Sequence, residues 1–379
     1  MNKIKVGITG QAGFVGTHLY NELGLFPVKY ERILFKDSYF GNPALVSQFV
    51  KQCDVIVHLA AVNRHPNENE LYKININLVN TLIDTLTQED VKPHIIFSSS
   101  TQESLDNPYG KSKRKGRSML VEWAERNQAP FTALIIPNVY GPFGLPNYNS
   151  FVATFCQKLT HGEAPEIITD NDVNLIYVSS LCKHIMANIE ETQSAGHPVI
   201  QEKHVPFDFT KKVSEILEKL KVFKEGYFDR GMIPALDTGD DINLFNTFRS
   251  YIDLPSYFPY RLKQNIDTRG AFVETLRLMT GGQVSFSTTK PNITRGNHFH
   301  THKIERFTVI KGQAKIQLRK IGTDQTIDFY LDGSEPSYVD MPVWYTHNIT
   351  NIGTGDLYTQ FWINEHYNEA DPDTYSEGV

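Results

Sequence analysis

The first half of the chain alternates short apolar runs with segments in which apolar residues recur at helical spacing. The apolar runs predict strands at residues 4–8, 33–35, 54–61, 94–98 and 131–136, and the helical spacing predicts helices at 15–23, 75–86 and 109–126. Near-continuous apolar strands between helices are typical of a parallel sheet covered on both faces. We therefore expect an α/β fold with a doubly wound parallel sheet in this half.

From about Arg261 the pattern changes to short strands in which polar and apolar residues alternate. Such strands are expected at residues 283–287, 306–310, 314–318, 326–331 and 357–363. Glycine-containing turns separate several of them, which is typical of an antiparallel barrel or sandwich. We place the join within residues 245–260, and expect one domain over residues 1–250 and an all-β domain over residues 258–379.

The composition supports two globular domains and excludes several functional classes. With 379 residues, of which 40% are hydrophobic, the chain is long enough for two cores. A net charge of -6 gives no general attraction to nucleic acid or to an anionic membrane. The three cysteines form no CxxC pair, and the N-terminus shows no secretory pattern, so we expect a cytoplasmic protein without disulfides.

Three glycines, Gly10, Gly13 and Gly16, follow the first expected strand and open the first expected helix. Glycines in this place let the backbone approach a pyrophosphate, which rests on the helix N-terminus. A structural turn also needs glycine, but the strand-turn-helix context favours dinucleotide binding.

Tyr109 and Lys113 are four residues apart, so on a helix they share one face. A neighbouring ammonium stabilises a phenolate, and Lys113 is therefore expected to lower the pKa of Tyr109. Tyr109 could then give a proton to a carbonyl oxygen while hydride arrives at the carbon. A pair with this spacing is often only an exposed helix surface, but it follows a strand that ends in three serines, residues 98–100, which favours a catalytic role.

These pieces together resemble the extended short-chain dehydrogenase/reductase family, whose members act on nucleotide sugars. The resemblance covers residues 1 to about 245 and includes the segments 58–61 and 137–142. It implies a Rossmann-like fold and catalytic roles for Ser100, Tyr109 and Lys113. The residues that it places around the cofactor are Gly10, Gly13, Phe14, Gly16, Lys36, Leu59, Ala60, Ala61, Asn75, Tyr109, Lys113 and Asn138.

Lys36 stands near the end of the second expected strand, where the ribose of a dinucleotide is recognised. An acidic group there favours NAD, whereas a cation favours the 2′-phosphate of NADP. Asp37 follows directly, but the cation leads us to expect NADPH rather than NADH.

The all-β half carries His298 and His300, then Glu305, and much later His347. A spacing of two puts both imidazoles of the first pair on one face of a strand. Three imidazoles and a carboxylate suit a divalent ion with open coordination positions. We expect zinc, although Fe, Mn or Ni would also accept this ligand set. His302 follows the same alternation as His298 and His300. Its possible roles are a base, an outer-shell group or a solvated neighbour.

The spacing of these ligands resembles the two motifs of the cupin family. The first runs from Gly296 through Glu305 to Gly312, and the second from Pro342 through His347 to Asn351. Trp344 stands where the second motif usually has glycine. The resemblance implies a metal-binding barrel that pairs into a homodimer.

A reductase domain followed by a cupin resembles a family of bifunctional capsular polysaccharide biosynthesis enzymes, over nearly the whole chain. It implies a UDP-4-keto-6-deoxy-N-acetylhexosamine substrate, epimerised at C3 by the cupin and then reduced at C4 with NADPH. The product would be UDP-N-acetyl-6-deoxytalosamine, a precursor of N-acetylfucosamine. Candidates for the base at C3 are Lys303, His302 and Tyr345.

Three alternatives remain open at this point. The N-terminal domain could be a nucleotide-sugar epimerase or dehydratase that recycles its cofactor. The cupin could be non-catalytic and serve sugar binding or dimerisation. The metal could be purely structural.

Overall fold

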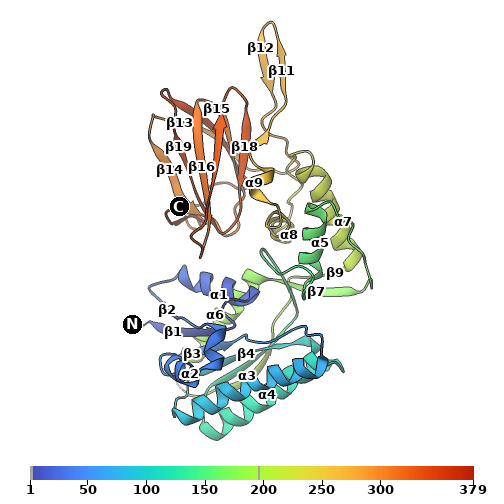
Figure 1. Ribbon diagram of the computed structural model, residues 1–379, viewed down its shortest axis with the longest axis vertical. Helices are drawn as coiled ribbons and strands as arrows, with labels where there is room; N and C mark the ends of the chain where they lie inside the picture. Colours follow the sequence, from blue (N-terminus) through green and yellow to red (C-terminus); the bar gives the residue numbers. More distant parts are fainter. Residues whose placement is uncertain (1–2, 195–196) are drawn as a thin grey trace. The chain divides into compact units, whose positions relative to one another are not determined.

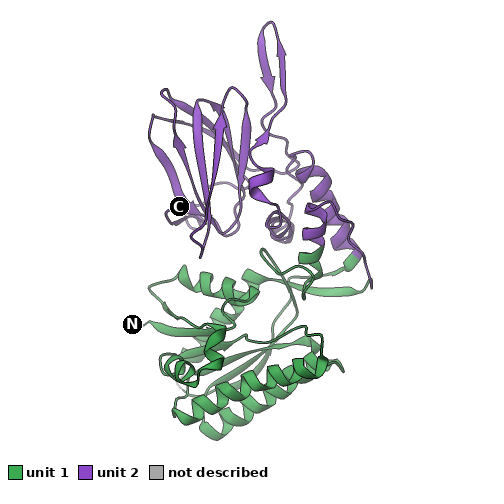
Figure 2. Cartoon of the chain, viewed as in Figure 1, with its two compact units in different colours: residues 1–154, 169–213 green, residues 155–168, 214–379 purple. Residues whose placement is uncertain are grey.

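We describe the protein from a computed structural model, which describes residues 3–194 and 197–379. The chain divides into two compact units, distinguished by colour in Figure 2. Unit 1 consists of residues 1–154 and 169–213, and unit 2 of residues 155–168 and 214–379. Within the described residues, no helix combines the length and the apolar character that a membrane span requires.

Unit 1 is built on a six-stranded sheet with the strand order β2-β1-β3-β4-β5-β8. All neighbouring strands in it are parallel. Its strands are β1 (Ile4–Thr9), β2 (Tyr30–Ile33), β3 (Val55–His58), β4 (His94–Ser100), β5 (Phe131–Ile136) and β8 (Ile200–His204). The Rossmann-like parallel sheet expected from the sequence is confirmed.

Helices cover both faces of this sheet (Figure 1). One core contains residues of α1 (Phe14–Gly24) and α6 (Val178–Ser194), and the other contains residues of α2 (Pro43–Val50), α3 (Glu68–Gln88) and α4 (Pro108–Asn127). Val57 packs into the first core and its neighbour Ile56 into the second, as the period of two in a strand requires. The strands therefore carry apolar side chains on both faces of the sheet.

Smaller elements complete unit 1. A three-stranded sheet joins β6 (Asn138–Tyr140), β7 (Asp172–Tyr177) and β9 (Phe209–Lys212), and two short 3-10 helices are η1 (Asp37–Gly41) and η2 (Thr101–Ser104). The second strand was expected at residues 33–35. β2 instead begins at Tyr30 and ends at Ile33, so the expected range is wrong at both ends. Phe35 is buried for another reason: its ring packs against Phe49, 4.7 Å away, after the strand has ended.

Unit 2 combines helices with two five-stranded sheets. The helices are α5 (Phe151–Thr160), α7 (Val213–Phe223), the π-helical turn η3 (Lys224–Phe228), α8 (Gly239–Arg249) and α9 (Leu254–Tyr257). The first residues of α5 belong to unit 1, and α7 begins at the boundary between the units. One sheet has the order β10-β18-β15-β20-β13 and the other β17-β16-β19-β14-β21, and every strand pairing in both is antiparallel. The expected antiparallel region is confirmed.

The strands of the first sheet are β10 (Tyr260–Arg261), β13 (Gln283–Thr289), β15 (Glu305–Lys311), β18 (Ser337–Met341) and β20 (Leu357–Ile363). Those of the second are β14 (Thr294–Phe299), β16 (Gln313–Lys320), β17 (Thr326–Asp332), β19 (Tyr345–Asn351) and β21 (Tyr375–Ser376). Both sheets contribute to one apolar core, with Phe307 and Val309 from the first and Ile316 and Ile349 from the second. A separate hairpin, β11 (Gln264–Asp267) with β12 (Gly270–Val273), projects from this unit (Figure 1).

Candidate functional site

The glycine-rich turn lies where β1 ends and α1 begins, at the point where the strand order reverses. Gly10 has φ +72°, and a Cβ on it would lie 2.8 Å from the backbone N of Ala60. A Cβ on Gly16 would lie 2.2 Å from the carbonyl oxygen of Gly10. α1 starts after Gly13, without a side-chain cap and without an acidic residue in its first turn. These features fit a bound pyrophosphate, which accepts hydrogen bonds from the free N–H groups.

The chain after β3 lies beside this turn. β1 and β3 are neighbours with Thr9 opposite His58, so Leu59, Ala60 and Ala61 leave the sheet next to the glycines. All three are half-buried, as expected for residues lining a cofactor cleft. Phe14 is also half-buried, at the start of α1.

Three other expected cofactor residues differ in exposure. Lys36 and Asn138 are exposed, Lys36 directly before η1 and Asn138 at the start of β6. Gln11 Oε1 accepts a hydrogen bond from the N–H of Phe35, which brings the chain before Lys36 to the glycine turn. Asn75 is 5% exposed, and its amide brackets the N–H and carbonyl of Val62 at 2.7 and 3.0 Å. Asn75 therefore holds the chain after β3 in place.

Tyr109 and Lys113 lie in the first turns of α4, as the sequence predicted. Lys113 is 4% exposed, and its Nζ donates to the carbonyl oxygen of Ser98 at 2.9 Å. The ammonium lies 5.7 Å from the centroid of the Tyr109 ring. Burial lowers the pKa of Lys113 to about 8, against an opposing effect of Glu103.

The pKa of Tyr109 differs from expectation. Burial raises it above its ordinary value, and the nearby Tyr148 raises it further. The expected depression by Lys113 is therefore absent in the chain without cofactor, because desolvation of the phenolate dominates. Tyr148 was not among the expected site residues. Its hydroxyl accepts a hydrogen bond at 3.0 Å from the N–H of Asn63, a contact across 85 residues that no local spacing announces.

The three serines that end β4 have different partners. Ser98 donates to the carbonyl oxygen of His58 at 3.1 Å, and Ser99 donates to the carboxylate of Glu103. Ser100 accepts a hydrogen bond from the N–H of Gln102 at 3.2 Å. Because side chains alternate along a strand, Ser98 and Ser100 share the face that carries Lys113, and Ser99 points to the opposite face. Of these three hydroxyl groups, Ser98 and Ser99 already donate their hydrogen to another residue. Only Ser100 donates to none of the described residues, so its hydroxyl can donate to a substrate.

The four expected metal ligands converge in unit 2, although they come from different strands. His298 lies near the end of β14, which stops at Phe299, and His300 directly follows the strand. Glu305 begins β15 and His347 lies in β19. Their ligand atoms all lie within 4.8 Å of one another. A bulge between Gly296 and His298 shifts the register, so that His298 lies directly opposite His347. Bulges next to functional sites often redirect a side chain in this way.

The polar atoms of this cluster fit a metal ion. Nε2 of His300 and of His347 lie 3.0 and 3.2 Å from Oε2 of Glu305. These three atoms are buried and have no hydrogen-bond partner among the described residues. The Nδ1 atoms of the two rings instead meet carbonyl oxygens, of Asp373 for His300 and of Tyr345 for His347. Such bonds direct the Nε2 lone pairs at a metal.

Electrostatics in the cluster also favours a cation. Burial alone would raise the pKa of Glu305, but the close imidazoles of His300 and His347 hold that pKa well below its ordinary value. Burial, followed by the neighbouring His347 and His300, lowers the pKa of His298 to about 4. Burial opposes the charged form of His300 as well, yet Glu305 outweighs it and raises the pKa of that ring. A deprotonated carboxylate and a neutral His298 are the forms that bind metal.

Trp344 occupies the turn before β19 with φ +61°. This is the left-handed region, which explains why glycine would suit the position. The tryptophan is tolerated because the residue is only 3% exposed and its ring stacks on Phe299 at 5.6 Å. Its backbone N–H donates to the carbonyl oxygen of His300 at 2.8 Å. The turn therefore supports the ligand segment.

The three candidates for a base differ in their exposure and in the contacts of their side chains. Lys303 is 5% exposed and its Nζ donates to the carbonyl oxygen of Pro372 at 2.7 Å. The His302 side chain is 39% exposed, with Nδ1 3.7 Å from a carboxylate oxygen of Glu365. Burial raises the pKa of Tyr345, which is half-buried at the start of β19.

Two family models match the chain. The NAD dependent epimerase/dehydratase family matches residues 6–201, and the polysaccharide biosynthesis C-terminal domain matches residues 265–375. A relative from Pseudomonas aeruginosa, named UDP-2-acetamido-2,6-beta-L-arabino-hexul-4-ose reductase, is 32% identical over 99% of both chains.

Solved structures show the same likeness. The capsular polysaccharide assembling protein CapF from Staphylococcus aureus is 36% identical, with a TM-score of 0.60 over 99% of this chain and 100% of that one. The Bordetella bronchiseptica enzyme WbmF, solved with NAD+ and UDP, is 16% identical over 65% of this chain and 92% of that one, with a TM-score of 0.54, and shares the fold alone. The resemblance to bifunctional capsule-biosynthesis enzymes is thus confirmed, and the chain belongs to the NAD dependent epimerase/dehydratase family, in the group whose members carry a C-terminal polysaccharide biosynthesis domain.

Proposed function

We propose that the chain is a bifunctional enzyme that epimerises a UDP-4-keto-6-deoxy-N-acetylhexosamine at C3 and reduces its C4 ketone. The observation that carries the proposal is the presence of two separate built clusters in one chain. Unit 1 holds the pair Tyr109 and Lys113 and a dinucleotide-type glycine turn, and unit 2 holds the four converging side chains of the metal cluster. The name of the Pseudomonas aeruginosa relative, a UDP-linked 2-acetamido hexul-4-ose reductase, supports this substrate class.

The reduction would use Ser100, Tyr109 and Lys113. The hydroxyl of Ser100 would donate to the C4 carbonyl oxygen and orient it. NADPH would supply the hydride to C4, and Tyr109 would give its phenolic proton to O4. Tyr109 suits the role of an acid because burial keeps it protonated. Lys113 would stabilise the phenolate that remains, since both groups lie at the start of α4.

The epimerisation would take place in unit 2, whose paired sheets we assign to the cupin fold. A proton on C3 next to the C4 ketone is acidic, because its loss leaves negative charge on the carbonyl oxygen. His298, His300, Glu305 and His347 would hold a divalent ion, for which we propose zinc, and the ion would act as a Lewis acid on that oxygen. The product after reduction would be UDP-N-acetyl-6-deoxytalosamine, and the cupins of two chains would form a homodimer.

NADPH is proposed over NADH because Lys36 is exposed just after β2 and free to meet a 2′-phosphate. The test is a comparison of KM for NADPH and NADH in the wild type and in Lys36→Ala. We expect the variant to lose most of its preference for NADPH. An unchanged ratio would assign the preference to another residue.

The decisive experiment separates the two steps. The 4-keto sugar is incubated in deuterated water with and without NADPH, and deuterium at C3 is followed by NMR. We expect exchange at C3 without cofactor and reduction only with it. Glu305→Gln should abolish exchange but still reduce a sugar supplied in the C3-epimerised form, whereas Tyr109→Phe should show the reverse.

Each alternative gives a different result. A non-catalytic cupin predicts that Glu305→Gln leaves exchange at C3 unchanged. An epimerase or dehydratase that recycles its cofactor predicts no consumption of NADPH in proportion to product. Either outcome would reject the two-step proposal.

A further inference from the structure

The end of unit 2, residues 364–377, contacts the metal-ligand segment at three places. Oδ1 of Asn364 accepts a hydrogen bond at 2.8 Å from the N–H of Ile304. β21 pairs with β14, which places Ser376 opposite His298. Between these two contacts lies Asp373, which is 2% exposed. We propose that Asp373 is a positioning residue of the metal site, which fixes the ligand loop and the ring of His300 without binding the metal. The inference rests on the proposed metal site.

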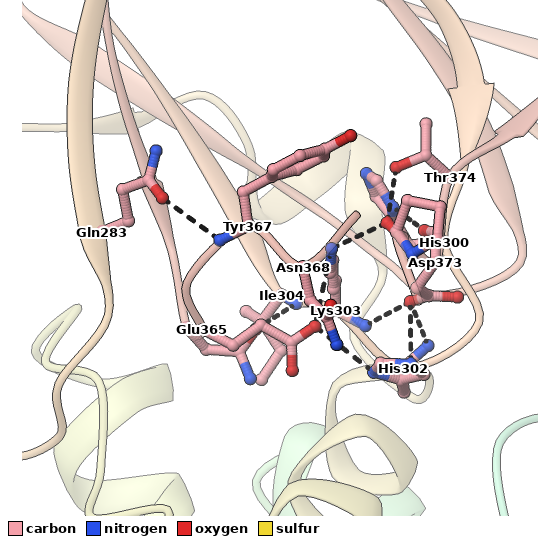
Figure 3. Close-up of polar contacts among 12 residues, drawn as sticks. Gln283, His300, His302, Lys303, Ile304, Glu365, Tyr367, Asn368, Asp373 and Thr374 are labelled. Carbon is pink, nitrogen blue, oxygen red and sulfur yellow. Dashed lines mark hydrogen bonds and ion pairs between the residues drawn. The ribbon is translucent and has the colours of Figure 1, made fainter. Parts of the chain in front are cut away.

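The carboxylate of Asp373 accepts hydrogen bonds from one short loop, residues 301–303 (Figure 3). Oδ1 accepts from the N–H and the hydroxyl of Thr301, at 2.9 and 2.7 Å. Oδ2 accepts from the N–H groups of His302 and Lys303, at 3.0 and 2.9 Å. One buried side chain thus binds three successive backbone N–H groups, and these lie directly between the ligands His300 and Glu305.

The backbone of Asp373 acts on a ligand itself. Its carbonyl oxygen accepts a hydrogen bond from Nδ1 of His300. An imidazole that donates through Nδ1 carries its lone pair on Nε2, and Nε2 is the atom that faces Glu305 at 3.0 Å. A residue that only capped the loop would need its side chain alone. Here the carboxylate fixes the loop, and the fixed main chain then sets the tautomer and orientation of the ring.

The preceding residue strengthens this arrangement. The carbonyl oxygen of Pro372 accepts a hydrogen bond from Nζ of Lys303 at 2.7 Å. The side chain of Lys303 is buried, so this bond holds residues 372 and 303 together away from solvent. Residues 372–373 and 300–303 therefore form one hydrogen-bonded cluster around the metal ligand His300.

Asp373→Asn tests the role with little change of shape. Asp373 has φ +38°, a region that asparagine tolerates better than most residues. The amide replaces one acceptor oxygen by an NH2 group, so two of the four donors lose their acceptor. Asp371→Asn is the matched control, since Asp371 is an exposed carboxylate in the same segment.

Zinc affinity is measured by competition with a chromophoric chelator, and the visible absorption of the Co²⁺-substituted protein reports the geometry of the site. We expect Asp373→Asn to bind zinc roughly 10–100-fold more weakly, as loss of an outer-shell partner does elsewhere, and to show an altered cobalt spectrum. Asp371→Asn should match the wild type in both. Zinc affinity within two-fold of wild type together with an unchanged spectrum would overturn the inference.

Thr301→Val serves as a second variant in case Asp373→Asn does not fold. It removes a single donor to Asp373, and we expect a smaller loss of zinc affinity, about three-fold. Wild-type affinity in a folded Thr301→Val would then count against the inference. A wild-type chain that binds no divalent metal would instead defeat the proposed metal site, so the two failures are distinguishable.

Discussion

Arg306 and Asp340 form a two-pronged ion pair inside unit 2, with Nε–Oδ1 and Nη2–Oδ2 distances of 2.7 and 2.9 Å. Their side chains are 2% and 0% exposed. Arg306 also donates to the carbonyl oxygen of Gly231, and the hydroxyl of Tyr227 donates to Asp340 at 2.8 Å. The pair therefore ties the helical part of unit 2 to β15 and β18, and the proposed metal ligand Glu305 directly precedes Arg306.

Asp340→Ala should destabilise unit 2 by about 3–5 kcal/mol, because it leaves the Arg306 guanidinium buried without its counter-charge. The measurement is the urea midpoint of the unfolding transition that responds to metal, which identifies unit 2. Asp267→Ala provides the control, since Asp267 pairs with Arg269 on the exposed hairpin. The control should leave the transition in place. Equal midpoints for the two variants would show that the buried pair does not hold unit 2 together.

Gly16→Ala should weaken NADPH binding at least ten-fold, which corresponds to about 1.4 kcal/mol. The added methyl group would lie 2.2 Å from the carbonyl oxygen of Gly10, so the turn beneath the pyrophosphate must shift. Binding is measured by the quenching of protein fluorescence on titration with NADPH. Gly41→Ala is the control, because a Cβ there meets nothing within 4 Å. If both variants bound NADPH equally well, the glycine turn would not be the pyrophosphate site.

Patterns that are local in sequence predicted much of the fold and most of the candidate site. The glycine triplet, the pair Tyr109 and Lys113 and the set of metal ligands are each visible as spacing. The strand β14 was predicted only around His298; its first residues, 294–297, were not predicted, because they are exposed and show no alternation. Its position depends on pairing with β19 and on the bulge before His298.

What the sequence could not reveal depends on distant contacts and on burial. Asp373 lies 72 residues from Thr301, and no spacing rule connects them. The pKa of Tyr109 was expected to fall because Lys113 is close in sequence. Burial reverses the direction, and the degree of burial is a property of the folded unit.

Lys113 should make the stability of unit 1 depend on pH. Burial lowers its pKa from 10.5 to about 8, so between these values the unfolded chain keeps the proton and the folded chain releases it. Below pH 8 the buried charge of Lys113 lowers the free energy of unfolding, and this loss is recovered as the pH rises towards 10.5. The pKa shift of Lys113 corresponds to about 3 kcal/mol of unfolding free energy. Lys113→Met lacks this gain. The unfolding free energy of wild type relative to the variant should rise across that window in urea titrations without cofactor, and a constant difference would contradict the assignment.

The three serines of β4 should have separable roles. Ser100→Ala should lower kcat for reduction by about 10²-fold, the usual cost of one donor to a developing oxyanion. Ser99→Ala should leave kcat near wild type but lower the melting temperature, because it breaks the bond to Glu103. Steady-state kinetics with pre-epimerised sugar, together with thermal melts, distinguishes them. If Ser98→Ala lost activity and Ser100→Ala did not, Ser98 would be the orienting serine.

Metal binding should depend on His347, which is fully buried and opposite His298. Elemental analysis after dialysis is expected to find about one divalent ion per wild-type chain and clearly less in His347→Ala, because the variant loses one of the four converging donors and binds the ion more weakly. His161→Ala, an exposed histidine, should retain the ion. Metal at 100 times its Kd should stabilise wild type by about 2.7 kcal/mol and His347→Ala hardly at all.

A purely structural ion is distinguished by chelation at a temperature where the apo chain stays folded. Exchange at C3 should then stop while circular dichroism is unchanged, whereas a structural ion would leave exchange in step with the folded fraction.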